Sequence, residues 1–344
     1  MTAMRLDEYD KSAVQLADEA YGKVLKFHHN REVTTPKPKP PDGCLYHYTT
    51  ADGLKGIIEN NELWAHSAYF LNDSAEIVYG CGVLKEALDG WIAANPQPDD
   101  SLALGTARHL QTTFGERMLN MQIVQPIYLA CFCEDDNLLS QWRAYGQSGG
   151  YSLGFQVPAL DFLTGQGFKP EPCTYTSKWV KVEYDRKQQL KRCKEILDAI
   201  LPAFGDSATA RAFEAIGDHP LSGFHIVSNA VVDVLMEEIV GFKSEAFAVE
   251  KEWRVVVRER VLTKQGTDDG GKAPTPVYFR PCRGALIPYV KLIPTNSGDK
   301  LPIYCVRTGP TLEANAATLA LPLFLQTKGY PGVRIRRSAI SVRI

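Results

Sequence analysis

Strand-like and helix-like hydrophobic patterns alternate along the chain. Residues 127–133 (IYLACFC) form a continuous apolar run, which is typical of a strand buried on both faces. Other short apolar or alternating runs predict strands at 44–48, 63–66, 151–157, 179–184, 253–257, 277–280, 286–292, 303–306 and about 333–335. Apolar positions at helical spacing predict helices at 51–60, about 73–94, 102–121, 138–145, 185–204, 221–242 and about 312–328. Thr50 is the candidate N-cap of the first of them. This mixture predicts an α+β protein.

The N-terminal region differs from the rest. Residues 5–29 carry a moderately amphipathic helical pattern, and the run Thr34-Thr-Pro-Lys-Pro-Lys-Pro-Pro41 then fixes too many φ angles for a helix or a sheet. We therefore expect a helical appendage at 1–33, a proline-rich connector at 34–43 and one folded domain at 44–344. The appendage is a candidate for oligomerisation or for docking a partner.

Composition excludes several classes of protein. With 38 Lys and Arg against 40 Asp and Glu, the net charge is −2, so no overall positive field attracts nucleic acid. No stretch approaches the roughly 20 apolar residues of a membrane span. The 8 cysteines are scattered and lie mostly in apolar runs, which indicates buried thiols and no metal site. We expect a cytoplasmic protein without a membrane partner.

His47 and Thr49 are the first candidate site residues. In a strand they share one face, while Tyr46 and Tyr48 take the other. An imidazole and a hydroxyl could thus meet a ligand. The alternative is structural: a histidine that hydrogen-bonds within the sheet and a threonine that caps the next helix.

Two further segments combine polar and aromatic residues at helix starts. Asn72 and Asp73 suit a helix N-terminus, and could also hold a polar ligand there. Trp142 and Tyr145 lie three residues apart on a predicted helix, beside Arg143. Such a group can stack a flat ring and pair with a phosphate, or it can simply anchor a short helix.

The segment Val249-Glu-Lys-Glu-Trp-Arg-Val-Val-Val257 carries charges into a valine-rich strand. If the strand includes them, Glu250, Glu252 and Arg254 share one face. Charged groups there need a partner or a function, because burying them alone is costly. A surface ladder in which Glu252 pairs with Arg254 is the alternative. The common dinucleotide, P-loop, serine-hydrolase and zinc-protease motifs are absent from the sequence.

Taken in order, several short motifs resemble a bacterial family of unknown function that is similar to the ADP-ribosyltransferase superfamily. They are His47-Tyr-Thr49, Phe70-x-Asn-Asp73, Cys131-Phe-Cys-Glu134, Ser140-x-Trp-Arg-x-Tyr145, Gly154-Phe155 and Glu250-x-Glu-Trp-Arg254. The resemblance covers the chain from about Cys44 to the C-terminus. It implies an α+β fold with a split, bent mixed sheet, surrounding helices and a cleft that takes NAD as substrate, without a metal.

The resemblance also implies roles for individual residues. His47, followed by Thr49, matches the position that binds the adenosine-side ribose. Glu252 matches the late glutamate that contacts the nicotinamide ribose. Glu250 and Glu252 could exchange roles. Tyr48, Trp142 and Tyr145 are alternatives for the aromatic that packs on nicotinamide. Arg143 is a candidate for the pyrophosphate, and Asn72 for a further contact.

The expected activity is transfer of ADP-ribose to a protein or nucleic-acid acceptor, as in a bacterial toxin or defence effector. The resemblance is incomplete, because the middle strand lacks a Ser-Thr-Ser triplet. A non-catalytic nucleotide- or partner-binding module is therefore one alternative. Nucleic-acid processing at a basic face is another, with the following residues: Lys37, Lys39, Arg334, Arg336 and Arg337.

Overall fold

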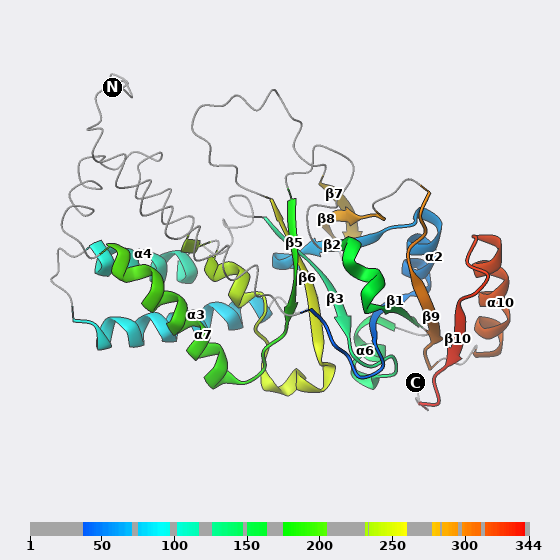
Figure 1. Ribbon diagram of the computed structural model, residues 1–344, viewed down its shortest axis with the longest axis horizontal. Helices are drawn as coiled ribbons and strands as arrows, with labels where there is room; N and C mark the ends of the chain where they lie inside the picture. The colour runs from blue at the N-terminus through cyan, green and yellow to red at the C-terminus, as the bar shows by residue number, and fades with distance from the viewer. Residues whose placement is uncertain are drawn as a thin grey trace, which may run out of the picture. The chain divides into compact units, whose positions relative to one another are not determined.

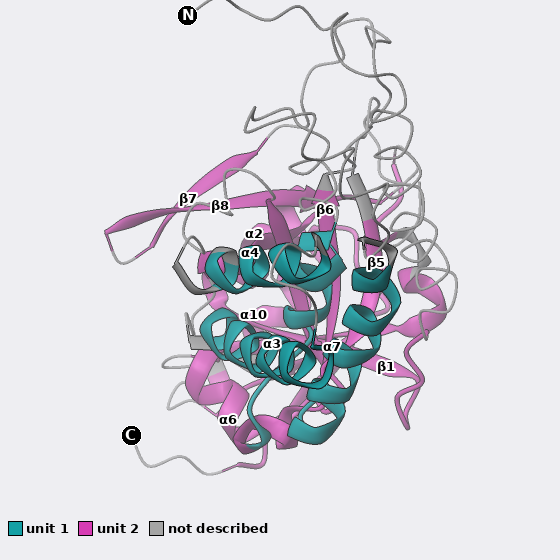
Figure 2. Cartoon of the chain, turned by 90° about the vertical axis from the view of Figure 1, so that its left-hand side faces the viewer, with its two compact units in different colours: residues 1–35, 73–125, 183–245 teal, residues 36–72, 126–182, 246–344 magenta. Residues whose placement is uncertain are grey.

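A computed structural model gives the fold of the chain. It describes residues 37–70, 75–96, 102–116, 126–146, 150–163, 175–204, 231–232, 234–259, 277–282, 284–294, 298–310 and 314–340. The chain divides into two compact units, coloured separately in Figure 2. Unit 1 contains 1–35, 73–125 and 183–245, and unit 2 contains 36–72, 126–182 and 246–344. The expected appendage at 1–33 and part of the connector lie outside the described residues.

The described part of unit 1 is mainly helical. Its elements are α3 (Ala75–Ala94), α4 (Leu102–Glu116), α7 (Arg186–Ile200) and helical residues 234–239. Helix α3 packs against both α4 and α7. Gly80 lets α3 approach residues 234–239 closely, because a Cβ at this position would lie 2.9 Å from the Ile239 carbonyl oxygen. The predicted helix over 185–204 is confirmed as α7, capped by Asp185 and followed by a 3₁₀ turn.

Unit 2 is built on a sheet of ten strands, most of which Figure 1 labels. The strands are β1 (Cys44–Thr50), β2 (Leu63–Ser67), β3 (Ile127–Cys133), β4 (Gly150–Gln156), β5 (Tyr175–Lys181), β6 (Glu252–Glu259), β7 (Tyr278–Cys282), β8 (Ala285–Leu292), β9 (Ile303–Thr308) and β10 (Arg334–Arg337). The order is β10-β9-β4-β1-β3-β2-β8-β7, with β6 joined to β3 and β5 joined to β6. Only the β9–β10 pair is parallel among these strands. The α+β class is thus confirmed, with a mixed sheet.

Strand β3 is paired along the whole of one edge and only at the ends of the other. One of its edges pairs with β6 along all seven residues, from Ile127 to Cys133. On the other side, β1 meets β3 at a single pair, Tyr46 with Cys133, and β2 meets it at Leu129 and Tyr128. Residues 130–132 of β3 therefore pair with neither β1 nor β2. We call this interruption the β3 gap.

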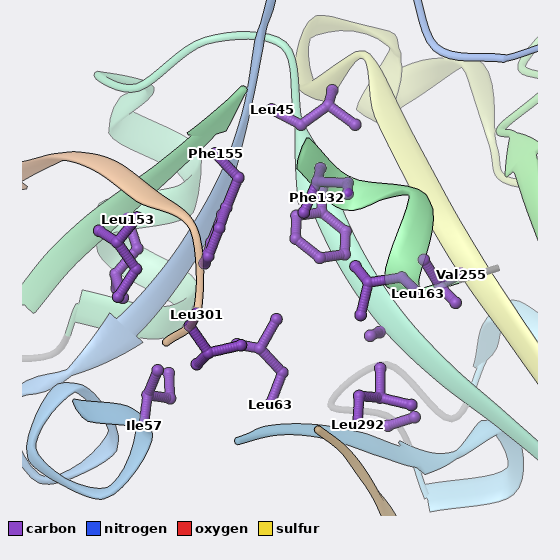
Figure 3. Packing of buried hydrophobic residues seen from close by; sticks show 14 of the residues in the cluster. Leu45, Ile57, Leu63, Phe132, Leu153, Phe155, Leu163, Val255, Leu292 and Leu301 are labelled. Carbon is purple, nitrogen blue, oxygen red and sulfur yellow. The ribbon is translucent and has the colours of Figure 1, made fainter. Parts of the chain in front are cut away.

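Period-two patterning of the strands sorts side chains onto two faces. One face carries the main core, where Leu45, Phe132, Phe155 and Val255 come together from four strands (Figure 3). The opposite face carries a smaller cluster that includes Tyr46, Tyr48, Trp142, Cys133 and Cys305. We call these the main-core face and the tyrosine face. Because paired residues of neighbouring strands share a face, the strand registers assign every side chain of the sheet to one of them.

Helices of unit 2 follow the predicted caps. Helix α2 (Ala51–Asn60) begins at Thr50, whose hydroxyl accepts a hydrogen bond from the Gly53 amide. Its apolar positions Leu54, Ile57 and Ile58 are buried. Near the C-terminus, α10 (Ala314–Thr327) connects β9 to β10. The predicted helix over 138–145 is shorter than expected, since α6 (Leu139–Gln141) gives way to a π-helical turn at Trp142–Gly146.

Two strand predictions need correction. The strand expected at 179–184 is displaced, because β5 runs from Tyr175 to Lys181. A shared face for Glu250, Glu252 and Arg254 required the strand to include Glu250, and it does not. Residues Glu245–Glu250 form a 3₁₀ helix, and Lys251 has a left-handed φ of 44°, so β6 begins only at Glu252.

Candidate functional site

His47 lies at the β3 gap. Its Nδ1 is 2.9 Å from the backbone oxygen of Cys131, the middle residue of the unpaired stretch. Since a carbonyl oxygen only accepts hydrogen bonds, Nδ1 carries the proton and Nε2 is the acceptor nitrogen of the neutral ring. Burial lowers the pKa of His47, which favours that neutral form. The ring also lies 5.7 Å from that of Phe132, centroid to centroid. The side chain is therefore held in one tautomer with a defined acceptor.

A second histidine, His66 on β2, borders the same gap. Its Nε2 accepts a hydrogen bond of 2.8 Å from the Nε of Arg280 on β7. Burial, the charge of Arg280 and the proximity of His47 lower the pKa of His66 to about 3. Two neutral imidazoles thus border the gap from opposite faces, because His66 pairs with Leu129 on the tyrosine face and His47 pairs with Leu153 on the main-core face. The sequence analysis missed His66 and Arg280. The alternation of Leu63, Trp64, Ala65 and His66 was a signal for a polar strand face, but nothing linked it to a residue 214 positions later.

Aromatic rings continue from His66 across β2, β8 and β7. Trp64 stacks on Tyr289 with ring centroids 4.2 Å apart, and Tyr278 stacks on Tyr289 at 5.7 Å. The Nζ of Lys291 lies 4.5 Å from the centre of the Tyr278 ring and 3.1 Å from a carboxylate oxygen of Glu62. Chemically, this row offers flat apolar surfaces beside cations, a combination that suits a heterocyclic ring.

Tyr48 and Trp142 lie on the tyrosine face and are both engaged. The Tyr48 hydroxyl donates to the Asp135 carbonyl at 2.8 Å and accepts from the Leu138 amide at 2.9 Å. Trp142 is 3% exposed, packs edge-on against Tyr48 with centroids 4.7 Å apart, and donates from Nε1 to Asn137. The two rings thereby anchor residues 134–146 on the sheet. Of the three aromatic candidates, only Tyr145 stays partly exposed.

Arg143 and Thr49 occupy simpler positions. Arg143 is exposed on the π-helical turn that follows α6. Thr49 packs on the start of α2, since a Cβ on Gly53 would lie 1.9 Å from the Thr49 Oγ1. The neighbouring Thr50, and not Thr49, caps this helix. Asn72 lies outside the described residues.

Glu252 forms a buried ion pair with Arg254. Two hydrogen bonds join them, Nε to Oε1 at 2.9 Å and Nη2 to Oε2 at 3.0 Å, and Arg254 is only 1% exposed. The register pairs Glu252 with Cys133, which places both on the tyrosine face. His47 pairs with Leu153 of the main core. The structure therefore does not bring His47 and Glu252 onto one face, and the exposed ladder considered as an alternative is in fact buried.

Other charged positions of the motif are also buried. Glu250 is 6% exposed at the end of its 3₁₀ helix. Trp253, on the main-core face, donates from Nε1 to Glu134 at 2.9 Å. In unit 1, Lys243 pairs with Glu76 at 3.0 Å, and both side chains are nearly inaccessible. These groups have partners that hold the local backbone in place.

The described ranges contain neither a candidate metal cluster nor a candidate membrane-spanning helix. There, no cluster of three or more His, Cys, Asp or Glu residues has the arrangement of a metal site. The same part of the chain contains no helix with the length and apolar character needed to cross a bilayer.

Comparisons with known proteins add one family match. A search of curated proteins and a search of solved structures gave no match. A domain described as a protein of unknown function (DUF2971) is found at residues 141–255. It includes Trp142, Arg143, Tyr145, Glu250 and Glu252 but not His47, and nothing in the comparisons links it to ADP-ribosyltransferases. Similarity to a family of unknown function is thus shown over this segment.

Proposed function

We propose that the chain is an NAD-consuming, ADP-ribosyltransferase-like enzyme that binds its substrate at the β3 gap. The observation that carries the proposal is the state of His47. Its Nδ1 is bound to the Cys131 carbonyl, so a neutral ring offers Nε2 as an acceptor for a ribose hydroxyl. The interruption between β1 and β2 on β3 is also what a split sheet of the ADP-ribosyltransferase type requires.

Residues that approach the gap from the tyrosine face supply complementary chemistry to His47, which reaches it from the main-core face. Arg280, bonded to His66, brings a cation that can pair with a pyrophosphate oxygen. The stacked rings of Trp64 and Tyr289 provide an apolar surface that a base or a nicotinamide ring can meet. The reaction breaks the bond between nicotinamide and ribose, and nicotinamide leaves with the bonding electron pair. An acceptor nucleophile then bonds to the ribose carbon and releases its proton; water as acceptor gives hydrolysis.

The second candidate is a module that binds NAD without cleaving it. The specific observation in its favour is Glu252, whose two carboxylate oxygens are both bound by Arg254 on the face opposite His47. A carboxylate in that position does not stabilise the positive charge that develops on the ribose. In this version the Glu252–Arg254 pair is structural.

The test is incubation of the full chain with NAD labelled on the adenylate, in the presence of a cell lysate. Free nicotinamide and label on macromolecules are followed for the wild type, His47→Gln and a matched His109→Gln variant on α4. The enzyme proposal predicts nicotinamide release that His47→Gln abolishes and His109→Gln retains, with both melting temperatures close to the wild type.

Each other result has a defined meaning. Release that His47→Gln leaves unchanged contradicts the site. Absence of release, together with an NAD-dependent rise in melting temperature that His47→Gln removes, establishes the binding module instead. If NAD is neither cleaved nor bound, both candidates are wrong.

A further inference from the structure

Arginine side chains gather on β9 and β10, at the end of the sheet far from β7 in strand order. The parallel register pairs Arg336 with Arg307 and Arg334 with Cys305. Because Cys305 belongs to the tyrosine face, all three arginines project from that face. Arg337 pairs with Thr308 and therefore takes the main-core face, where it is exposed at the end of the strand. We call Arg307, Arg334, Arg336 and the adjacent Tyr304 the arginine surface.

The positive charge of this surface is only partly neutralised. Asp136 is held by two arginines at once: its Oδ2 lies 2.9 Å from the Nε of Arg307 and 3.0 Å from the Nη1 of Arg336. Arg307 also donates from Nη1 to the backbone oxygen of Arg337 at 2.6 Å. Within the described residues, no carboxylate pairs with Arg334 or Arg337. One carboxylate among the three guanidinium groups of this surface leaves two positive charges close together.

Like charges at directly opposed positions, such as Arg307 and Arg336, weaken a strand pair unless an anion lies between them. For the Arg307–Arg336 pair, Asp136 is such an anion and neutralises part of the charge. Arg334 stays open to solvent and to an external anion. Arg334 lies 4.7 Å over the ring of Tyr304, so a flat cation and an aromatic ring form one layer there.

We propose that the arginine surface binds the phosphate backbone of a single-stranded nucleic acid. An arginine guanidinium can donate two parallel hydrogen bonds to phosphate oxygens, whereas a lysine ammonium cannot form this two-pronged contact. Arg334 and Arg336 are two residues apart on a strand, about 6.6 Å, so they can meet successive phosphates of an extended strand. The Arg334–Tyr304 layer adds a surface for base stacking, which an acidic protein or an anionic membrane does not use.

The inference is independent of NAD chemistry, because binding is measured without NAD. If both proposals hold, nucleic acid is the class of partner from which the acceptor is drawn. The net charge of −2 for the whole chain means that attraction comes from this local surface and not from an overall positive field.

The test is fluorescence anisotropy of a labelled oligodeoxythymidine and of a mixed-sequence RNA, both single-stranded, titrated with the full chain. Two phosphate contacts predict a slope of log K against log salt of about −1.4, or roughly a 7-fold loss of affinity between about 50 and 200 mM salt. The double variant Arg334→Gln/Arg336→Gln should bind less tightly and lower the magnitude of the slope by about 1.4. Lys55→Gln, which removes an exposed cation from α2, is the control and should bind like the wild type.

Several outcomes overturn the proposal. They are a flat salt response, unchanged binding by the double variant, and equal weakening by Lys55→Gln. Binding to phosphatidylserine vesicles but not to either oligonucleotide, lost in the double variant, would assign the surface to a membrane instead. A melting temperature within a few degrees of the wild type confirms that the double variant is folded.

Discussion

His47 donates a hydrogen bond of 2.9 Å from its imidazole to the backbone carbonyl of Cys131, across the stretch of β3 that neither β1 nor β2 covers. A side chain thus satisfies a backbone acceptor that sheet pairing would otherwise satisfy. The same bond sets the tautomer of the ring. The contact that satisfies the exposed acceptor at the interruption therefore also fixes the candidate ligand acceptor, Nε2.

The neutral histidines make the stability of the protein sensitive to acid. Burial lowers the pKa of His47, and burial with Arg280 lowers that of His66 to about 3, while the unfolded value is about 6.5. Below about pH 6.5 the unfolded chain binds protons that the folded chain does not, so the free energy of unfolding falls as the pH falls. The decrease is about 1.4 kcal/mol per pH unit for each histidine while it titrates only in the unfolded state.

The measurement is urea unfolding of the wild type and of His66→Gln at pH 7 and pH 5. Most carboxylates remain ionised over this range, so they contribute little to the difference. The glutamine oxygen can still accept from Arg280, and the variant should lose less stability between the two pH values. An equal loss in both proteins would show that His66 is not the origin of the effect.

Breaking the Glu252–Arg254 pair should destabilise the protein strongly. Arg254→Met leaves the Glu252 carboxylate buried without its cation, and we expect a loss of about 3–5 kcal/mol. Glu252→Gln/Arg254→Met together should recover part of that loss, because the Glu252 charge is removed together with its cation. Urea unfolding of the single and double variants gives the coupling. Strictly additive effects would contradict a direct interaction between the two side chains.

Gly309 is required by the packing of Trp142. A Cβ there would lie 2.8 Å from Cε3 of the indole and 3.1 Å from the Gly150 carbonyl oxygen. We expect Gly309→Ala to cost about 1–3 kcal/mol through overpacking. Gly56→Ala on α2, where a Cβ has nothing within 4 Å, is the matched control and should stabilise by about 0.4–1 kcal/mol. Thermal unfolding distinguishes the two, and equal melting temperatures would refute the packing argument.

The hydroxyl of Tyr48 should stabilise the folded protein. Tyr48→Phe leaves the Asp135 carbonyl and the Leu138 amide without their partner, at a cost of about 1–3 kcal/mol. Hydrogen exchange of the Leu138 amide should become faster. Tyr278→Phe removes a hydroxyl from a partly exposed ring and should change the free energy of unfolding by less than about 0.5 kcal/mol. Unchanged protection of Leu138 in Tyr48→Phe would argue against this role.

The local pattern of the sequence predicted most elements of the fold. Alternation in 44–48 put His47 and Tyr48 on opposite faces, and the structure agrees, because His47 pairs with Leu153 of the main core whereas Tyr48 itself belongs to the cluster on the tyrosine face. Thr50 was predicted as the cap of α2 and is. Such features depend on residue spacing and on hydrogen bonds between near neighbours in the chain, so they can be predicted from the sequence.

Contacts between distant residues could not be predicted in this way. The bond from His47 spans 84 positions and that from Arg280 to His66 spans 214. Periodicity says which face a side chain takes, but strand pairing decides which faces meet. The left-handed Lys251 also broke the expected Glu250 to Glu252 alternation without a glycine to signal it.

The sequence by itself therefore determined the α+β class, most strand and helix positions and the face of each strand residue. Only the tertiary structure decided that His47 bridges a gap beside His66, that Glu252 is buried against Arg254 on the other face, and that Arg307 and Arg336 share Asp136. The physical reason is that local spacing sets a side chain's direction, whereas its partner depends on how strands far apart in the chain are placed side by side.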